Sequence, residues 1–143
     1  MEGHYVQVTS KQPVSPGDIL ELLSCNCKRG CTAVLEIIDQ PDWNEDTEKN
    51  AAAKKLLMPL AAHYLVKVQS RNLPLDPVAR FHIGNGSSLD RINWAADTST
   101  QAMQQSAGIM VNYLYDLDKI EVNHEACAEK GIVSASKNVT SLL

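Results

Sequence analysis

The residues from Glu45 to Ser70 form the longest stretch with a helical period, and they constrain the fold more than any other segment. Apolar side chains recur there at intervals of three and four residues, while lysines and a histidine fall on the other side. The apolar face consists of Leu57, Leu60, Ala61, Tyr64, Leu65 and Val68. A helix of this length must bury that face against another layer, so the chain needs at least two layers of structure.

After "NLPLDP", the period changes from helical to alternating. Apolar and polar side chains alternate from Arg80 to Ile83, which predicts a strand with His82 on its polar face. Asn85-Gly86 tolerates the positive φ angles of a tight turn and predicts a hairpin to a returning strand, Leu89 to Ala95. A two-residue loop would put His82 opposite Leu89, and a three-residue loop would put it opposite Asp90. The sequence leaves this register open.

Further helices and one buried strand complete the predicted fold. Thr98 and Gln101 form a capping box, which predicts a helix to Ala107 that Gly108 ends. The segment "GIMVNYLY" predicts a buried strand, followed by helices over residues 118–130 and 134–143. Residues 1–16 read as a loose extension because several breakers follow a short alternating stretch. This order fits an α+β or α/β arrangement in which helices cover a largely antiparallel sheet, and we expect the α+β class.

Length, composition and charge narrow the class of protein. With 143 residues, 44% hydrophobic and 21% charged, the chain has the makeup of one soluble globular domain. A net charge of −4 and the lack of a Lys/Arg run argue against nucleic acid or an acidic membrane surface as main partner. The longest apolar run is too short to span a bilayer, and the N-terminus lacks a signal-peptide pattern. We therefore expect a cytoplasmic protein without a membrane partner.

Three cysteines lie close together near the N-terminus. Cys25, Cys27 and Cys31 could in principle converge on zinc or an iron–sulfur cluster. Their spacing is not that of a standard zinc finger, and the fourth ligand would have to be Cys127 or a histidine from far along the chain. We therefore expect free thiols and no metal site.

The four histidines differ in their surroundings. His4, His63 and His124 fall among polar residues and are expected to be solvated surface groups. His82 shares a predicted strand face with other polar groups beside a turn, so it could be a working acid or base or simply a polar residue of a half-exposed strand. Spacing alone leaves both interpretations open.

From about residue 33 onward, the chain resembles the C-terminal part of the malonyl-CoA decarboxylase family. The segments "LLMPLAAHYLVK", "LDPVARFHIGNGSSLDRINWAADTS", "QQSAGIMVNYLYDLDKIEVNHEA" and "VSASKNVTSLL" carry the resemblance, in that order. It implies that residues 32–143 are the C-terminal part of an acetyltransferase-like (GNAT-like) catalytic domain, here incomplete, and that residues 1–31 are an N-terminal extension.

The resemblance also implies an activity and its site. The family consists of carboxy-lyases of fatty acid metabolism that convert malonyl-CoA to acetyl-CoA and CO2, with no cofactor beyond the CoA of the substrate. The family's catalytic histidine matches His82 in "FHIGNG", as proton donor to the enolate, and a tyrosine near the site matches Tyr115. Arg91 and Asn93 could bind substrate if their strand face is that of His82, although the resemblance gives them no role.

Two parts of the family pattern have poor or no counterparts here. The catalytic serine segment is matched only by Ser15-Pro16-Gly17, and the CoA-binding loop is missing. Two hypotheses follow: a malonyl-CoA decarboxylase with His82 as proton donor, or a truncated, non-catalytic acyl-CoA-binding remnant or subunit. The second would need a partner chain for the serine and the loop, and either protein could form a homo-oligomer.

Overall fold

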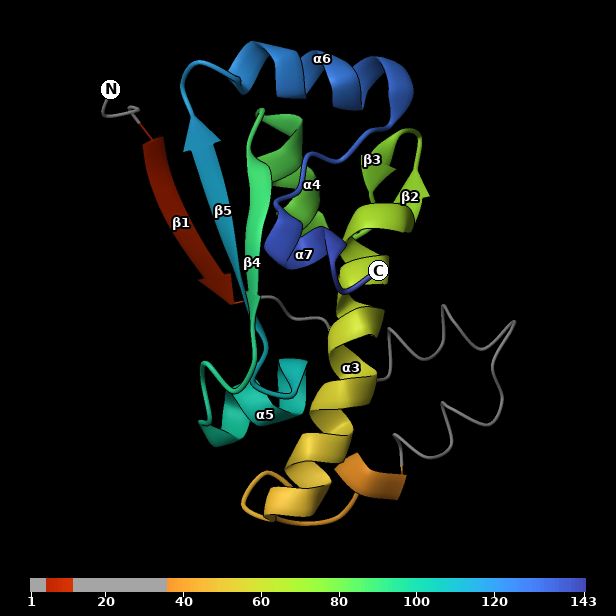
Figure 1. The fold of residues 1–143 in the computed structure, drawn as a ribbon, viewed down its shortest axis with the longest axis vertical. Helices are drawn as coiled ribbons and strands as arrows, with labels where there is room; N and C mark the ends of the chain where they lie inside the picture. The colour runs from red at the N-terminus through yellow and green to blue at the C-terminus, as the bar shows by residue number, and fades with distance from the viewer. Residues whose placement is uncertain (1–4, 12–35) are drawn as a thin grey trace.

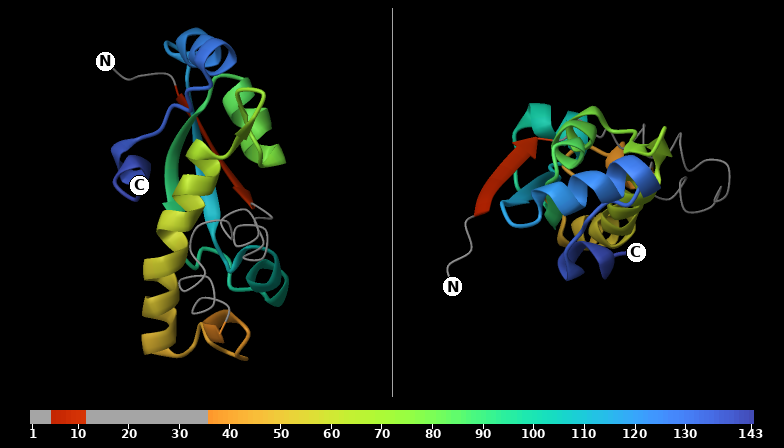
Figure 2. Two further views of the ribbon diagram at one scale, coloured as in Figure 1. Left: turned by 90° about the vertical axis from the view of Figure 1, so that its right-hand side faces the viewer. Right: turned by 90° about the horizontal axis from the view of Figure 1, so that it is seen from above.

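A three-stranded antiparallel sheet with helices on one face forms the centre of the molecule. The computed structural model describes residues 5–11 and 36–143. Within them, the sheet order is β1 (Tyr5–Lys11), β5 (Met110–Asp116), β4 (Ser88–Asn93), and all pairings are antiparallel. The long helix α3 (Thr47–Lys67) runs beside the sheet, and α6 (Ile120–Lys130) crosses its end (Figure 1, Figure 2). The predicted α+β class is confirmed at this level.

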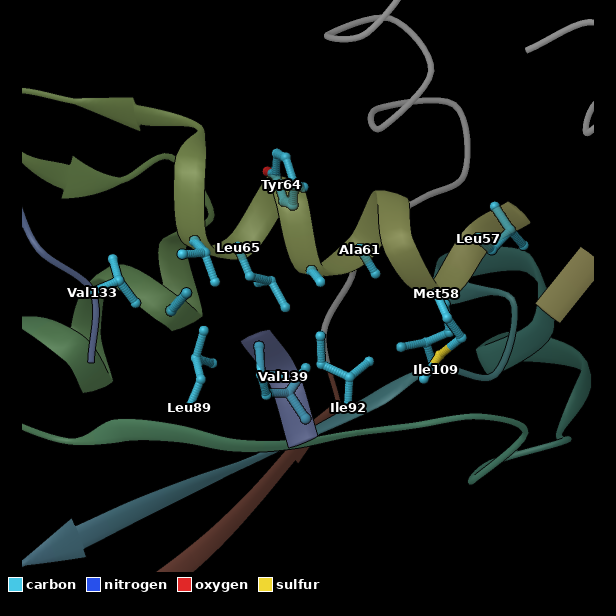
Figure 3. Packing of buried hydrophobic residues seen from close by; sticks show 14 of the residues in the cluster. Leu57, Met58, Ala61, Tyr64, Leu65, Leu89, Ile92, Ile109, Val133 and Val139 are labelled. Carbon is cyan, nitrogen blue, oxygen red and sulfur yellow. The ribbon is translucent and has the colours of Figure 1, made fainter. Parts of the chain in front are cut away.

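Helix α3 confirms the helix predicted from the apolar period. The Asp46 carboxylate caps its first turn by accepting from the backbone N–H groups of Glu48 and Lys49. Its buried face points toward Leu89 and Ile92 on β4, as Figure 3 shows. The buried side chains of the helix are Ala53, Leu57, Met58, Ala61, Ala62, Tyr64, Leu65 and Val66. Burial of this face in the shared core therefore holds the helix against the sheet.

The sheet includes a strand from the segment predicted to be a loose extension. Backbone pairing places Tyr5 opposite Asp116 and Lys11 opposite Met110 along the full length of β5. The prediction of a loose extension was wrong for residues 5–11. Backbone hydrogen bonds to a neighbouring strand can hold a segment as a strand. Helix- and strand-breaking residues further along the chain do not prevent this pairing.

Strand β4 has a bulge and a covered outer edge. The register with β5 shifts between Leu89 and Arg91, so Asp90 is an extra residue. The backbone of Leu89 accepts from Ser136 N and donates to Ser134 O, both at 2.8 Å. The chain then forms the short helix α7 (Lys137–Thr140), which confirms the predicted C-terminal helix. The C-terminal segment thus shields an edge that would otherwise expose unpaired backbone groups.

The structure contradicts the predicted hairpin around His82. Residues 80–83 belong to helix α4 (Pro77–Gly84), not to a strand. Asp76 accepts from Ala79 N at 2.8 Å and Pro77 is the first helical residue, a standard helix start that overrides four residues of alternation. Phe81 is 64% exposed while Ile83 is buried, because positions two apart on a helix face nearly opposite ways.

The remaining elements follow the predictions closely. Helix α5 (Thr100–Ser106) is capped by the Ser99 hydroxyl, one residue later than the predicted capping box. Strand β5 and helix α6 confirm the predicted buried strand and polar helix. A small hairpin of β2 (Gln69–Ser70) and β3 (Leu73–Pro74) connects α3 to α4.

Several predictions fall on residues that the structure does not describe. Cys25, Cys27 and Cys31 lie there, as does Ser15, so the cysteine and serine predictions are untested. Across residues 5–11 and 36–143, no helix has the length and apolar character to cross a membrane.

Asp76 offers a test of what fixes the start of α4. We expect Asp76→Ala to lower the free energy of unfolding by about 2 kcal/mol, because this cap is buried and its loss leaves the Ala79 N–H unsatisfied. The matched variant Asp46→Ala removes an exposed cap on α3 and should lose only about 1 kcal/mol. Urea unfolding measures both, and an equal or smaller loss at Asp76 would contradict this account.

Candidate active site

His82 lies near the C-terminal end of α4, where the chain turns back into the sheet. Helix α4 ends at Gly84, and the backbone N–H groups of Asn85 and Ser87 both donate to the His82 carbonyl, at 3.2 and 3.1 Å. The His82 side chain is partly exposed. The turn therefore fixes the backbone of this residue and leaves its imidazole accessible.

Gly86 makes this turn possible. Its φ angle is +91°, and a Cβ atom placed there would clash with the carbonyl oxygen of Ile120. The Gly86 carbonyl also accepts from the Asn123 side chain at 3.1 Å. Only glycine meets both the backbone conformation and the close approach to α6.

The His82 ring packs among three aromatic side chains. Its ring stacks on Tyr113, with centroids 4.4 Å apart and an interplanar angle of 23°. Phe81 and Tyr115 meet it edge-on, at 5.1 and 5.8 Å. Its Nδ1 atom lies 2.7 Å from the Tyr115 hydroxyl, which is a strong hydrogen bond. One ring nitrogen is therefore fixed by β5, while Nε2 has no hydrogen-bond partner among the described residues.

Burial favours the neutral form of both members of this hydrogen bond. It lowers the pKa of His82 below its ordinary value of 6.5, because the charged imidazolium loses solvation. Burial also raises the pKa of the Tyr115 phenol, and the nearby Ser87 hydroxyl partly opposes this. A neutral imidazole beside a neutral phenol can hold and pass a proton, which is the chemistry of a general acid or base.

The two other predicted site residues lie on the opposite face of the sheet. In the β4–β5 register Arg91 is opposite Asn112, whereas Leu89 is opposite Tyr113. Since faces alternate along β5, Arg91 and Asn93 face away from Tyr113 and from His82. The Asn93 side chain instead donates to Asn112 Oδ1 at 3.1 Å. The structure thus brings Tyr115 to His82 but does not bring Arg91 or Asn93 there.

Among the residues that the structure describes, the other histidines and Cys127 form no second site. His63 and His124 are exposed, as predicted, and His124 Nδ1 donates to the Gly84 carbonyl at 2.7 Å. Cys127 is a buried free thiol whose pKa is raised by burial, so it is an unreactive group. Within the described part of the chain, no three potential ligands gather in a way that could hold a metal ion.

An open pocket of about 810 Å³ lies away from His82. It is formed by residues 38–45 together with α5 and the residues beside it. Its lining includes Asp39, Asp42 and Glu45, whose carboxylates would repel the phosphates of CoA. The pocket therefore does not extend the site around His82.

Tyr113 and Ser87 are the site residues that the sequence analysis missed. Tyr113 precedes Tyr115 by two positions on a correctly predicted strand, so the period of two could have placed both rings on one face. Ser87 follows the Asn-Gly pair, and no pattern in the sequence distinguishes it from the neighbouring Ser88.

Together, these observations define an α+β protein with a hydrogen-bonded histidine–tyrosine pair at a helix end. The family model "Malonyl-CoA decarboxylase C-terminal domain" matches residues 19–143. The chain belongs to the malonyl-CoA decarboxylase family.

Solved structures and curated relatives agree. The chain matches the crystal structure of malonyl-CoA decarboxylase from Rhodopseudomonas palustris with a TM-score of 0.85 and 39% identity, over 96% of this chain and 33% of that one. The crystal structure of malonyl-CoA decarboxylase from Agrobacterium vitis matches with a TM-score of 0.78 and 39% identity, over 96% of this chain and 35% of that one. Mitochondrial malonyl-CoA decarboxylase of Rattus norvegicus is 35% identical over 107 residues, covering 75% of this chain and 22% of the relative. The chain thus spans about a fifth of that relative's length.

Gly86 and Gly84 provide a matched pair for testing the turn. We expect Gly86→Ala to lower the free energy of unfolding by about 2–4 kcal/mol, because it combines a positive φ with a clash against the Ile120 carbonyl. Gly84→Ala should be neutral or slightly stabilising, since its Cβ would meet nothing closer than a Leu73 methyl at 3.9 Å. Denaturant unfolding compares the two, and similar losses would show that the turn does not need Gly86.

The titration of His82 tests the effect of burial. We expect its imidazole to titrate below pH 6.5 in ¹⁵N NMR spectra, with His82→Gln identifying the resonance. As the pH falls, the imidazole is protonated in the unfolded chain before it is protonated in the folded protein. The contribution of His82 to the free energy of unfolding is therefore fully present above pH 6.5 and is lost as the pH falls through the folded pKa. A midpoint at or above 6.5 would contradict this prediction.

Proposed function

We propose that this chain provides the proton-transfer site of an enzyme that decarboxylates malonyl-CoA to acetyl-CoA and CO2. The observation that carries the proposal is the 2.7 Å hydrogen bond between His82 and Tyr115, formed by the two residues that the family resemblance selects. Family membership supports the substrate, since the family is defined by malonyl-CoA decarboxylases.

The proposed reaction needs one proton at carbon. Loss of CO2 leaves the electron pair of the broken C–C bond in the thioester as an enolate, which must be stabilised at oxygen and protonated at carbon. His82 can present an N–H at Nε2 to the substrate while Tyr115 holds Nδ1. As Nε2 gives its hydrogen to the enolate carbon, Nδ1 takes up the hydrogen of the Tyr115 hydroxyl, and the phenolate then regains a proton from solvent.

The proposal assigns no substrate contact to Arg91 and Asn93 at this site, because they lie on the other face of the sheet. It also uses no metal or organic cofactor, and the only carrier is the CoA of the substrate. We further propose that the described sheet and helices are part of a GNAT-like catalytic domain. An antiparallel sheet that shares its apolar core with α3 supports this assignment.

A second candidate is an acyl-CoA-binding subunit that turns over only with a complementing chain. The small share of the relatives' length that this chain covers favours it. The phenyl ring of Phe81, 64% exposed and in contact with His82, offers an apolar surface at the site for the remainder of such an enzyme. A homo-oligomer would be another way to cover this surface. The cytoplasmic location stays a prediction from the sequence, and the curated relative from Rattus norvegicus is named as a mitochondrial protein.

Release of labelled CO2 from malonyl-CoA tests the proposal. We expect His82→Gln to lower the rate about 100-fold or more, and Tyr115→Phe to lower it about tenfold, because a proton donor and one hydrogen bond are lost. His63→Gln, an exposed change on α3, should leave the rate unchanged.

The assay is run on the chain alone and after co-expression with the part of the Rhodopseudomonas palustris enzyme that this chain does not cover. Turnover only in the second case supports the subunit hypothesis. Full activity of His82→Gln in a preparation that decarboxylates would remove this histidine from the reaction.

A further inference from the structure

The Ser87 hydroxyl is a buried polar group that the proposed reaction has not used. Its side chain is fully buried, and among the described residues its Oγ atom has no hydrogen-bond partner of ordinary geometry. Buried hydroxyl groups normally have a partner, because they lose the hydrogen bonds of water on folding. A hydroxyl kept in such a position calls for a specific reason.

The backbone places Ser87 beside both members of the His82–Tyr115 pair. Its N–H donates to the His82 carbonyl at 3.1 Å. In the β4–β5 register Ser88 is opposite Leu114, so the next position outward sets Ser87 opposite Tyr115. Directly opposed residues share a face and have Cβ atoms about 5 Å apart. The Ser87 side chain therefore points to the face where Tyr115 meets His82.

Ser87 also bears on the pKa of the Tyr115 phenol. Burial raises the pKa of Tyr115, whereas Ser87 lowers it, which is the effect of a donor directed at the phenol oxygen. By the geometric criteria for a hydrogen bond, the Ser87 Oγ atom is nevertheless left without a partner among the described residues.

We propose that Ser87 is a positioning residue that donates a hydrogen bond to the Tyr115 oxygen and thereby sets the tautomer of His82. With its oxygen accepting from Ser87, Tyr115 directs its own hydrogen to Nδ1 of His82. The imidazole then carries its hydrogen on Nε2, the nitrogen without a partner among the described residues. The catalytic consequence, a donor facing the substrate, rests on the proposed function.

The opposite arrangement would give different chemistry. If Tyr115 directed its hydrogen to Ser87, Nδ1 of His82 would carry the hydrogen and donate to Tyr115. Nε2 would then be a bare acceptor, suited to removing a proton rather than to stabilising an enolate oxygen or protonating its carbon. Ser87 thus selects between a donor and an acceptor at the same ring position.

The test uses ¹⁵N NMR of the whole chain without substrate, at a pH where His82 is neutral. In the unaltered chain we expect Nε2–H to dominate. Ser87→Ala should reduce the ratio of Nε2–H to Nδ1–H about fivefold to tenfold, because one hydrogen bond no longer orients Tyr115. Ser87→Thr, which keeps the hydroxyl, should restore the ratio.

The control is Ser88→Ala, which removes a hydroxyl from the next residue, on the other face of β4, and should change nothing. An unchanged tautomer ratio in Ser87→Ala, or an Nδ1–H form dominating in the unaltered chain, would overturn the proposal. If Ser87→Thr does not fold, Ser87→Ala compared with Ser88→Ala still decides the question.

This readout is independent of decarboxylation. In a preparation that turns over malonyl-CoA, Ser87→Ala should lower kcat with little change in KM, because the donor and not the binding site is altered. A tautomer shift in a chain that never decarboxylates would support the role of Ser87 and count against the proposed function. Turnover without a tautomer shift would do the reverse.

Discussion

The close approach of Gly86 to the Ile120 carbonyl is the constraint on which the candidate site depends. Helix α4 ends at Gly84 and β4 begins at Ser88, so the direction of the chain reverses within three residues. That tight reversal sets His82 beside the neighbouring strand β5, where Tyr113 and Tyr115 project from the same face. A side chain at position 86 would push α6 and the turn apart and carry His82 away from its partner.

The turn is stabilised by residues that take no part in proton transfer. Asn123 of α6 donates to the Gly86 carbonyl and accepts from Ser134, while His124 donates to the carbonyl of Gly84. The C-terminal segment pairs with the outer edge of β4 through Leu89. The last 25 residues of the chain thus hold the site from outside, and α3 supplies the apolar core beneath it. Substitutions in α6 that break these hydrogen bonds would therefore change the position of His82.

The elements that the sequence predicted well are those with long periods or strong end signals. Helix α3 has buried apolar residues over about four turns, and β5 is mostly apolar, so the local pattern and the tertiary burial agree. The prediction of a strand over residues 80–83 was wrong because four alternating residues fit either a strand or one turn of helix. The helix start at Asp76-Pro77 decides for the helix. The prediction of a loose extension was wrong for residues 5–11 because their structure comes from pairing with a strand about 100 positions away. His82 and Tyr115 were selected by family resemblance, whereas Ser87 and Tyr113 emerged only from packing.

By itself, the sequence determined that the chain has an amphipathic helix, a buried strand and an α+β architecture, because these follow from the period of apolar residues along the chain. It also supplied the family's histidine and tyrosine. Only the tertiary structure decided that these two meet, although 33 positions separate them, and that Arg91 and Asn93 turn away. The reason is the strand register. One bulge at Asp90 and one glycine turn fix which face each side chain occupies, and neither feature changes the period of apolar residues along the sequence.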